Sequence, residues 1–284
     1  MTSEAVSSAM HHSVGSSGMR KTGARVALAD MVESLRSIRV ALVFGWQDVA
    51  QRYRRSRIGA FWLTLNTAIF IAAIGLIFGT LFRAPAGEFL LYLGVSIIVW
   101  NFLSTTIAEG CTTFIASEGI ILQVRMPLFI HIIRTLWRNV IILGHNIVIF
   151  PVVLFLVGDF LDWKALLAVP GLLLLILNLA WLTLVCALIC TRFRDMTQVF
   201  TNFLQVMFYL TPVMWMTRTL PERVPSLVYE VNPFYHLLQL VRMPLLGEYP
   251  DGISWIVALG VAVVGWTWAI IFFGKYRWRV AYWL

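Results

Sequence analysis

Six long apolar stretches constrain what this chain can fold into. The stretches are Ile58–Phe82, Phe89–Ala108, Asn139–Gly158, Ala165–Thr191, Met196–Thr217 and Ile253–Gly274. None of them contains Asp, Glu, Lys or Arg, and Asp195 directly precedes the fifth. Each is long enough to span a membrane, since a helix needs ~20 residues to cross ~30 Å of hydrocarbon. Because lipid offers the backbone no hydrogen-bond partner, such runs predict six membrane-spanning helices and an all-α polytopic membrane protein.

The composition excludes a soluble domain and leaves little room for anything besides the spans. Of the 284 residues 60% are hydrophobic and 13% are charged, which is too apolar for a soluble globular protein. A catalytic domain of ordinary size does not fit beside six spans. The net charge of +8 would suit nucleic acid, but Lys and Arg cluster beside the ends of the stretches. We therefore expect a membrane and no nucleic acid as partner.

The distribution of Lys and Arg predicts the orientation. With the N-terminus inside, the internal segments carry 17 of the 22 Lys and Arg residues, and the external segments carry five. Positive residues favour the cytoplasmic side, and an even number of spans returns the C-terminus to it. Both termini are therefore expected in the cytoplasm.

Three regions follow from composition and periodicity. Residues 1–27 are rich in Ser and Gly and are expected to be a disordered tail. In residues 28–57 apolar side chains recur three and four apart, which predicts an amphipathic interfacial helix followed by a basic elbow. Residues 58–284 then form one six-span transmembrane domain. Within it, the proline-rich stretch Arg218–Gly252 predicts short external re-entrant helices between the fifth and sixth spans.

Few side chains are suited to chemistry inside the membrane. His145, beside Asn146, is the only ionisable candidate within a stretch, and such a pair more often hydrogen-bonds a neighbouring helix than relays protons. Gly274-Lys275-Tyr276 lacks the residues of a phosphate-binding loop. We expect no catalytic residue, no metal and no cofactor in this chain, so a separate subunit would have to power any transport.

Several segments in order resemble a known family. These are Arg52–Trp62 at the entry to the first span, Ser117–Leu122 followed by Arg125–Pro127, Leu210–Val213, and Val231–Pro233 followed by Arg242. Over roughly residues 35–284 the chain resembles the membrane subunits of type-2 ABC exporters for polysaccharides, the Wzm-, KpsM- and TagG-like permeases. The resemblance implies a homodimer with two cytoplasmic ATPase subunits, which would bind ATP and Mg. It also implies the bacterial inner membrane and a lipid-linked substrate such as O-antigen, capsule or a teichoic-acid-type polymer.

The resemblance also suggests where the ATPase would bind. A coupling helix would lie within Glu109–Arg125 in the second cytoplasmic segment, although a loop resting on the membrane is an alternative. The coupling residues would be Thr113, Ser117, Glu118, Gly119 and Arg125.

The basic elbow and the aromatic residues each allow two interpretations. Arg52, Arg54, Arg55 and Arg57 anchor the interface, or they receive the phosphate of a lipid-linked glycan. Aromatic rings either face lipid and pack, or they line a glycan channel between the first, second and fifth spans. The channel candidates are Phe61, Trp62, Phe70, Tyr92, Trp100, Phe102, Phe208, Tyr209 and Trp215.

Two other functions remain as alternatives to polysaccharide export. A type-2 ABC exporter of a small hydrophobic drug or lipid has the same six-span plan. A membrane-embedded glycan-modifying enzyme would need a polar catalytic cluster at a membrane face, and the sequence offers no convincing one.

Overall fold

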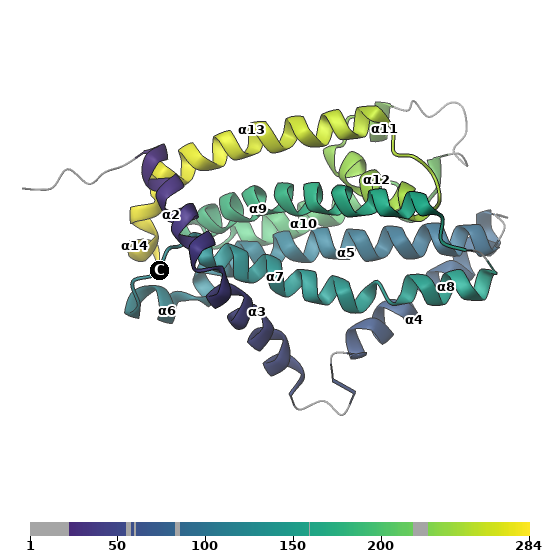
Figure 1. The fold of residues 1–284 in the computed structure, drawn as a ribbon, viewed down its shortest axis with the longest axis horizontal. Helices are drawn as coiled ribbons and strands as arrows, with labels where there is room; N and C mark the ends of the chain where they lie inside the picture. Colours follow the sequence, from purple (N-terminus) through teal and green to yellow (C-terminus); the bar gives the residue numbers. More distant parts are fainter. Residues whose placement is uncertain (1–22, 55–57, 60, 83–85, 159, 218–226) are drawn as a thin grey trace, which may run out of the picture.

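The computed structural model describes residues 23–54, 58–59, 61–82, 86–158, 160–217 and 227–284 (Figure 1). The regular secondary structure of these residues is helical, and they include no strand. The helices are α2 (Ala24–Arg36), α3 (Ile38–Tyr53), α4 (Phe61–Phe82), α5 (Ala86–Ala116), α6 (Glu118–Gln123), α7 (Phe129–Asn146), α8 (Ile149–Val157), η1 (Trp163–Leu167), α9 (Ala168–Arg192), α10 (Met196–Leu210), α11 (Leu227–Glu230), α12 (Pro233–Leu245), α13 (Gly252–Tyr276), η3 (Arg277–Arg279) and α14 (Val280–Trp283).

Five helical stretches in the described residues are long and apolar enough to cross a membrane. They are Phe61–Phe78, Gly87–Gln123, Phe129–Val157, Trp163–Arg192 and Gly252–Trp283. The prediction of an all-α polytopic membrane protein is confirmed at this level. The fifth predicted stretch, Met196–Thr217, is not among them and is helical only over the 15 residues of α10. A turn at Thr211-Pro212 follows, where proline cannot continue the helix.

The centre of the bundle is the pair α5 and α9 (Figure 1). α4, α7, α8, α10 and α12 pack on α5, whereas α12 and α13 pack on α9. Close approach of α12 to α9 depends on Gly171, where a Cβ atom would lie 2.2 Å from the carbonyl oxygen of Leu240. At one end of the bundle lie α2, α6 and α14, which we call the termini end. At the opposite end lie α11 and the end of α8.

Two predicted boundaries differ from the structure. The amphipathic helix predicted for residues 28–57 is two helices, α2 and α3, which begin at Ala24 and are separated at Ser37. Residues 1–22 of the predicted tail lie outside the described residues. The segment predicted to hold a coupling helix begins inside α5, because α5 continues to Ala116. Gly110 lies within α5 and allows a close approach to α9, because a Cβ atom there would lie 2.6 Å from Thr183 Cγ2.

Hydrogen bonds to Asp30 hold helix α2 against the bundle at the termini end. The carboxylate of Asp30 accepts hydrogen bonds from the backbone N–H of Leu128 at 3.0 Å and of Phe129 at 2.9 Å. It also accepts one from Nε of Arg277 at 2.6 Å. One buried side chain therefore joins α2 to the start of α7 and to the end of α13.

Candidate functional site

An uncharged groove runs between α4, α5 and α10. It has a volume of about 320 Å³ and is lined by Phe70, Trp100, Asn101, Ser104, Thr105, Ala108, Thr201, Leu204, Gln205 and Phe208. No described residue that lines it is ionisable. The groove therefore combines neutral polar groups with aromatic rings at the depth of the apolar spans.

Helical spacing produces the polar side of this groove. On α5, Asn101, Ser104 and Thr105 are three and four residues apart, and Thr201 and Gln205 repeat this spacing on α10. The Thr105 hydroxyl donates to the carbonyl of Asn101 and lies 3.1 Å from Oδ1 of Asn139. Among the described residues of α10 only Leu204 is buried. Polar groups that face lipid without partners are costly. The face of α10 that carries Thr201 and Gln205 is therefore suited to a polar occupant or to another protein surface.

Aromatic side chains gather where the groove ends toward the opposite end of the bundle. The ring of Trp100 lies 5.8 Å from that of Phe208 and 6.2 Å from that of Phe234 on α12. Phe234 also lies 6.3 Å from Phe203 on α10. The start of α12 is thus packed against α5 and α10, two of the three helices that form the groove.

The structure brings together only some of the predicted channel aromatics. Phe70, Trp100 and Phe208 line the groove. Phe102 is buried in the core of the bundle, and Tyr92 lines a second cavity. The indole of Trp215 donates to the carbonyl of Tyr209 at 3.2 Å. Three further candidates are exposed away from the groove lining, namely Phe61, Trp62 and Tyr209.

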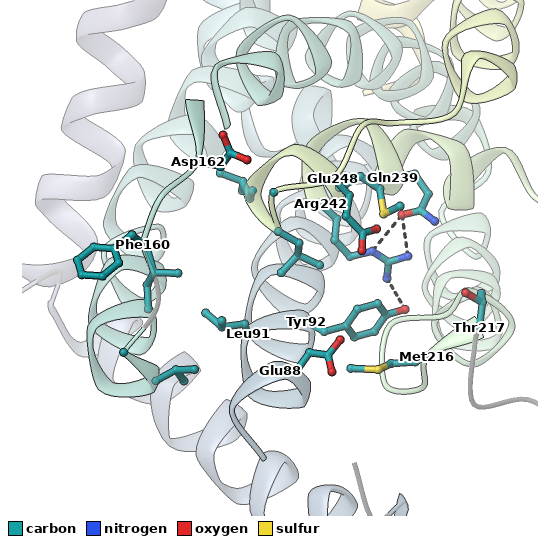
Figure 2. A pocket seen from close by; sticks show the side chains of 17 residues that line it. Glu88, Leu91, Tyr92, Phe160, Asp162, Met216, Thr217, Gln239, Arg242 and Glu248 are labelled. Atoms are coloured by element: carbon teal, nitrogen blue, oxygen red, sulfur yellow. Dashed lines mark hydrogen bonds between the residues drawn. The ribbon is translucent and has the colours of Figure 1, made fainter. Parts of the chain in front are cut away.

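The second cavity, of about 710 Å³, opens between α5, α8 and α12 toward the opposite end (Figure 2). Arg242 forms part of its wall, and only 1% of this residue is exposed. Its guanidinium donates to the hydroxyl of Tyr92 at 2.7 Å and to Oε1 of Gln239 at 2.9 Å. Sequence reasoning missed this site because Arg242 was counted with the external cations. The sequence signal that could have revealed the site is a single Arg within the apolar helical segment of α12.

The predicted coupling residues divide into a buried and an accessible set. The hydroxyl of Thr113 is buried and lies 2.9 Å from that of Thr135, and Ser117 is buried at the start of α6. Glu118 is half-buried, whereas Gly119 and Arg125 are exposed. The exposed apolar side chains of Leu122 and Val124 lie beside them.

Ion pairs join α3, α5 and α7. Asp48 on α3 pairs with Arg134 at 2.6 Å and with Arg138 at 3.2 Å, both on α7. Glu109 on α5 pairs with Arg138 at 2.7 Å and with Arg52 at 3.2 Å. These contacts connect α3, α5 and α7 into one unit.

Of the predicted entrance arginines, Arg52 and Arg54 lie at the end of α3. Burial alone would lower the pKa of Arg52, but the Glu109 carboxylate outweighs that effect and the pKa is raised. Arg54 is exposed, and Arg55 and Arg57 lie outside the described residues.

An apolar pocket of about 250 Å³ opens beside the same end of α3. It is lined by Trp46, Val49, Ala50, Tyr53, Gly59, Ile141 and His145. Nδ1 of His145 donates to the carbonyl of Ile141 in its own helix. This hydrogen bond therefore joins no second helix.

Comparison with known proteins gives the family. A family model described as ABC-2 type transporter matches residues 40–246. The O-antigen export system permease protein RfbA of Myxococcus xanthus is 27% identical over 199 residues, covering 68% of this chain and 74% of that protein. A protein of the same name from Klebsiella pneumoniae is 22% identical over 245 residues, covering 83% and 91%. Since the matched segment spans well over half of the chain and includes α4, α5, α10 and Arg242, the chain belongs to the ABC-2 type transporter family.

Proposed function

We propose that this chain is the permease of an ATP-driven exporter that moves a lipid-linked polysaccharide across the bacterial inner membrane. The observation that carries the proposal is the uncharged groove with its neutral polar groups and aromatic rings. A long polymer slides best over weak contacts, and a hydrogen bond contributes only about 1 kcal/mol. Desolvated ion pairs would hold each repeat in place. The O-antigen export names of the two relatives support the same substrate class.

Six spans remain part of the proposal, with α10 as the short one. Its 15 residues extend about 22 Å at 1.5 Å per residue, less than the ~30 Å of hydrocarbon. Helix α12 and the turn after α10 would complete the outer leaflet as re-entrant structure, because they pack on α5, α9 and α13. The termini end would face the cytoplasm, since Arg125, Arg192, Arg194 and Lys275 belong to segments at that end.

A second copy of the chain would complete the channel. In the single chain, the polar face of α10 is exposed at Gln198, Thr201, Asn202 and Gln205. Exposure of these amides and hydroxyls to lipid is unfavourable. Two grooves facing one another across a homodimer would convert this face into a hydrophilic path for sugars.

The lipid carrier would enter beside the end of α3. The apolar pocket there includes Trp46 and Tyr53, and Arg52 and Arg54 flank Tyr53 in the sequence. An acyl or prenyl chain suits the pocket, and a guanidinium binds phosphate oxygens in a fork. Arg55 and Arg57 belong to the same proposal.

Power would come from two ATPase subunits that bind ATP and Mg and contact α6. Glu118, Gly119 and Arg125 would provide the accessible contact surface. The buried side chains of Thr113 and Ser117 would hold the start of α6 in position. Movement of α6 would reach α3 and α7 through α5, because α6 contacts α5 and the ion pairs of Asp48 and Glu109 join α3, α5 and α7.

The groove provides the test of this function. Thr105→Val and Gln205→Leu each replace a polar lining group with an apolar one of similar size. Together they are expected to reduce export of long polysaccharide chains about tenfold, which corresponds to about 1.4 kcal/mol. The measurement is the length distribution of surface polysaccharide in cells whose own copy of the permease is deleted.

Thr267→Val is the matched control, since Thr267 is an exposed residue of α13 whose hydroxyl donates to its own helix. It should leave export unchanged. If the groove variants also export polymer of normal length and amount, the groove is not the path. Such a result would favour the alternative, an exporter of a small hydrophobic drug or lipid.

A further inference from the structure

We propose that Arg242 is a positioning residue that holds α12 and the turn 211–217 across the outer end of the uncharged groove. The inference rests on the proposed function only in treating the groove as a transport path. Arg242 would act through α12 and the turn, without contact with the polysaccharide.

The contacts of Arg242 reach three separate segments. One terminal nitrogen of the guanidinium donates to the Tyr92 hydroxyl at 2.7 Å, to the Ser96 hydroxyl at 3.0 Å and to the Pro212 carbonyl. Nε and the other terminal nitrogen donate to Gln239 at 3.2 and 2.9 Å. The guanidinium carbon also lies 4.3 Å from the centre of the Tyr92 ring. One side chain therefore joins α12, α5 and the turn that follows α10.

The turn itself is held by the same residues. The hydroxyl of Tyr92 lies 2.8 Å from the carbonyl oxygen of Pro212 and 3.0 Å from that of Trp215. Nδ2 of Asn232, which caps α12, donates to the hydroxyl of Thr211 at 2.8 Å. Because Thr211 directly follows the last residue of α10, these bonds fix the outer end of a helix that lines the groove.

The register of α12 on α5 links this contact to the end of the groove. Tyr92, Ser96 and Trp100 are four residues apart and lie on one face of α5. Arg242 contacts the first two, and Phe234, two turns earlier on α12, packs against Trp100. Trp100 also lines the groove. Movement of α12 away from Tyr92 would therefore carry Phe234 away from Trp100.

The chemistry of the site is unusual for a merely structural contact. Every described hydrogen-bond acceptor of Arg242 is a neutral oxygen. Burying a cation without a bonded carboxylate is expensive, and apolar residues commonly replace buried ionic groups without loss of stability. A planar fork that binds three segments at once nevertheless gives a geometry that no apolar side chain reproduces. The structure thus favours a role in setting the position of α12.

The test measures access to the groove rather than export. Gln205→Cys places a thiol in the groove of the full-length chain, and the three native cysteines are buried. A membrane-impermeant maleimide is applied from outside to membrane vesicles of known orientation. Arg242→Met is expected to raise the labelling rate at position 205 at least about tenfold, since loss of about 1.4 kcal/mol changes an opening equilibrium by that factor.

Three further variants decide between positioning and folding. Arg242→Lys keeps the charge but loses the fork, so its labelling rate should lie between those of wild type and Arg242→Met. Tyr92→Phe removes the hydroxyl that binds the turn and should raise the rate in the same direction. The double variant Tyr92→Phe with Arg242→Met should have about the same labelling rate as Arg242→Met alone. Arg194→Gln, a change of an exposed cation, should leave the rate unchanged.

An equal labelling rate in wild type and Arg242→Met, with both proteins eluting as folded species in gel filtration, would overturn the proposal. If Arg242→Met does not fold, an unchanged rate in Tyr92→Phe would overturn it instead. The labelling result does not depend on any glycan. A failed export test with Thr105 and Gln205 would therefore reject the channel and leave the measured effect of Arg242 standing.

Discussion

Replacement of Asp30 should destabilise this protein more than any change on the exposed face of the same helix. The side chain of Asp30 is fully shielded from solvent. It accepts bonds from the backbone N–H of Leu128 and Phe129 and from Nε of Arg277. Asp30→Ala removes both carboxylate oxygens and with them all three hydrogen bonds, and it leaves the first N–H groups of α7 without a partner.

The magnitude follows from these contacts. A buried N–H that loses its acceptor costs about 1–3 kcal/mol. Two such groups lose their acceptor here, and the pair with Arg277 adds less, because the Arg277 side chain is 33% exposed and its charge is partly screened. The total is about 3–5 kcal/mol. At roughly 2–4 °C per kcal/mol for a chain of this size, the midpoint of thermal unfolding should fall by about 10 °C.

The assay is thermal unfolding of the detergent-purified chain, followed by size-exclusion chromatography of heated samples. Asp30→Asn keeps one carbonyl oxygen as an acceptor, so its unfolding midpoint should lie between those of wild type and Asp30→Ala. Glu33→Ala is the control, since Glu33 lies on the same helix with an exposed side chain. Equal midpoints for Asp30→Ala and Glu33→Ala would refute the reasoning, because the N–H groups of α7 would then have found other partners.

Two further variants test packing and coupling. Gly171→Ala should lower the unfolding midpoint, because the new Cβ would meet the Leu240 carbonyl at 2.2 Å and overpacking costs about 1–3 kcal/mol. Gly260→Ala, with no neighbour within 4 Å, should instead stabilise α13 slightly, and the reverse order of midpoints would contradict this packing argument. Glu118→Arg should preserve ATP hydrolysis while export falls about tenfold or more, measured side by side in membrane vesicles. Normal export in Glu118→Arg, with Glu33→Arg as control, would remove α6 from the coupling contact.

The spans were predictable from the sequence because their cause is local. A helix needs only length and apolar side chains to be stable in lipid, and both properties are visible in stretches such as Ala165–Thr191. The end of α10 could also have been predicted, since Pro212 cannot continue a helix, but the predicted stretch ran on to Thr217. The family resemblance also followed from the order of short motifs along the chain.

The groove was only partly predictable. Its aromatic members Phe70, Trp100 and Phe208 were among the candidates, but its polar members were not. Thr105 and Gln205 are one hundred residues apart in the sequence, and each alone is an ordinary polar residue in an apolar helix. Only the packing of α10 on α5 brings them to the same groove.

The sequence by itself determined that this is an all-helical membrane protein, where its long spans lie and which family it resembles. The length and apolarity of each span and the order of the motifs are properties of the sequence alone. Tertiary structure alone decided that α5 continues past Glu109 and that Asp30 caps α7. It also decided that Arg242, which reads as an external cation, is buried against Tyr92. Hydrogen bonds between residues about 100 or 150 positions apart leave no periodicity in the sequence. Their energy appears only when the helices are packed.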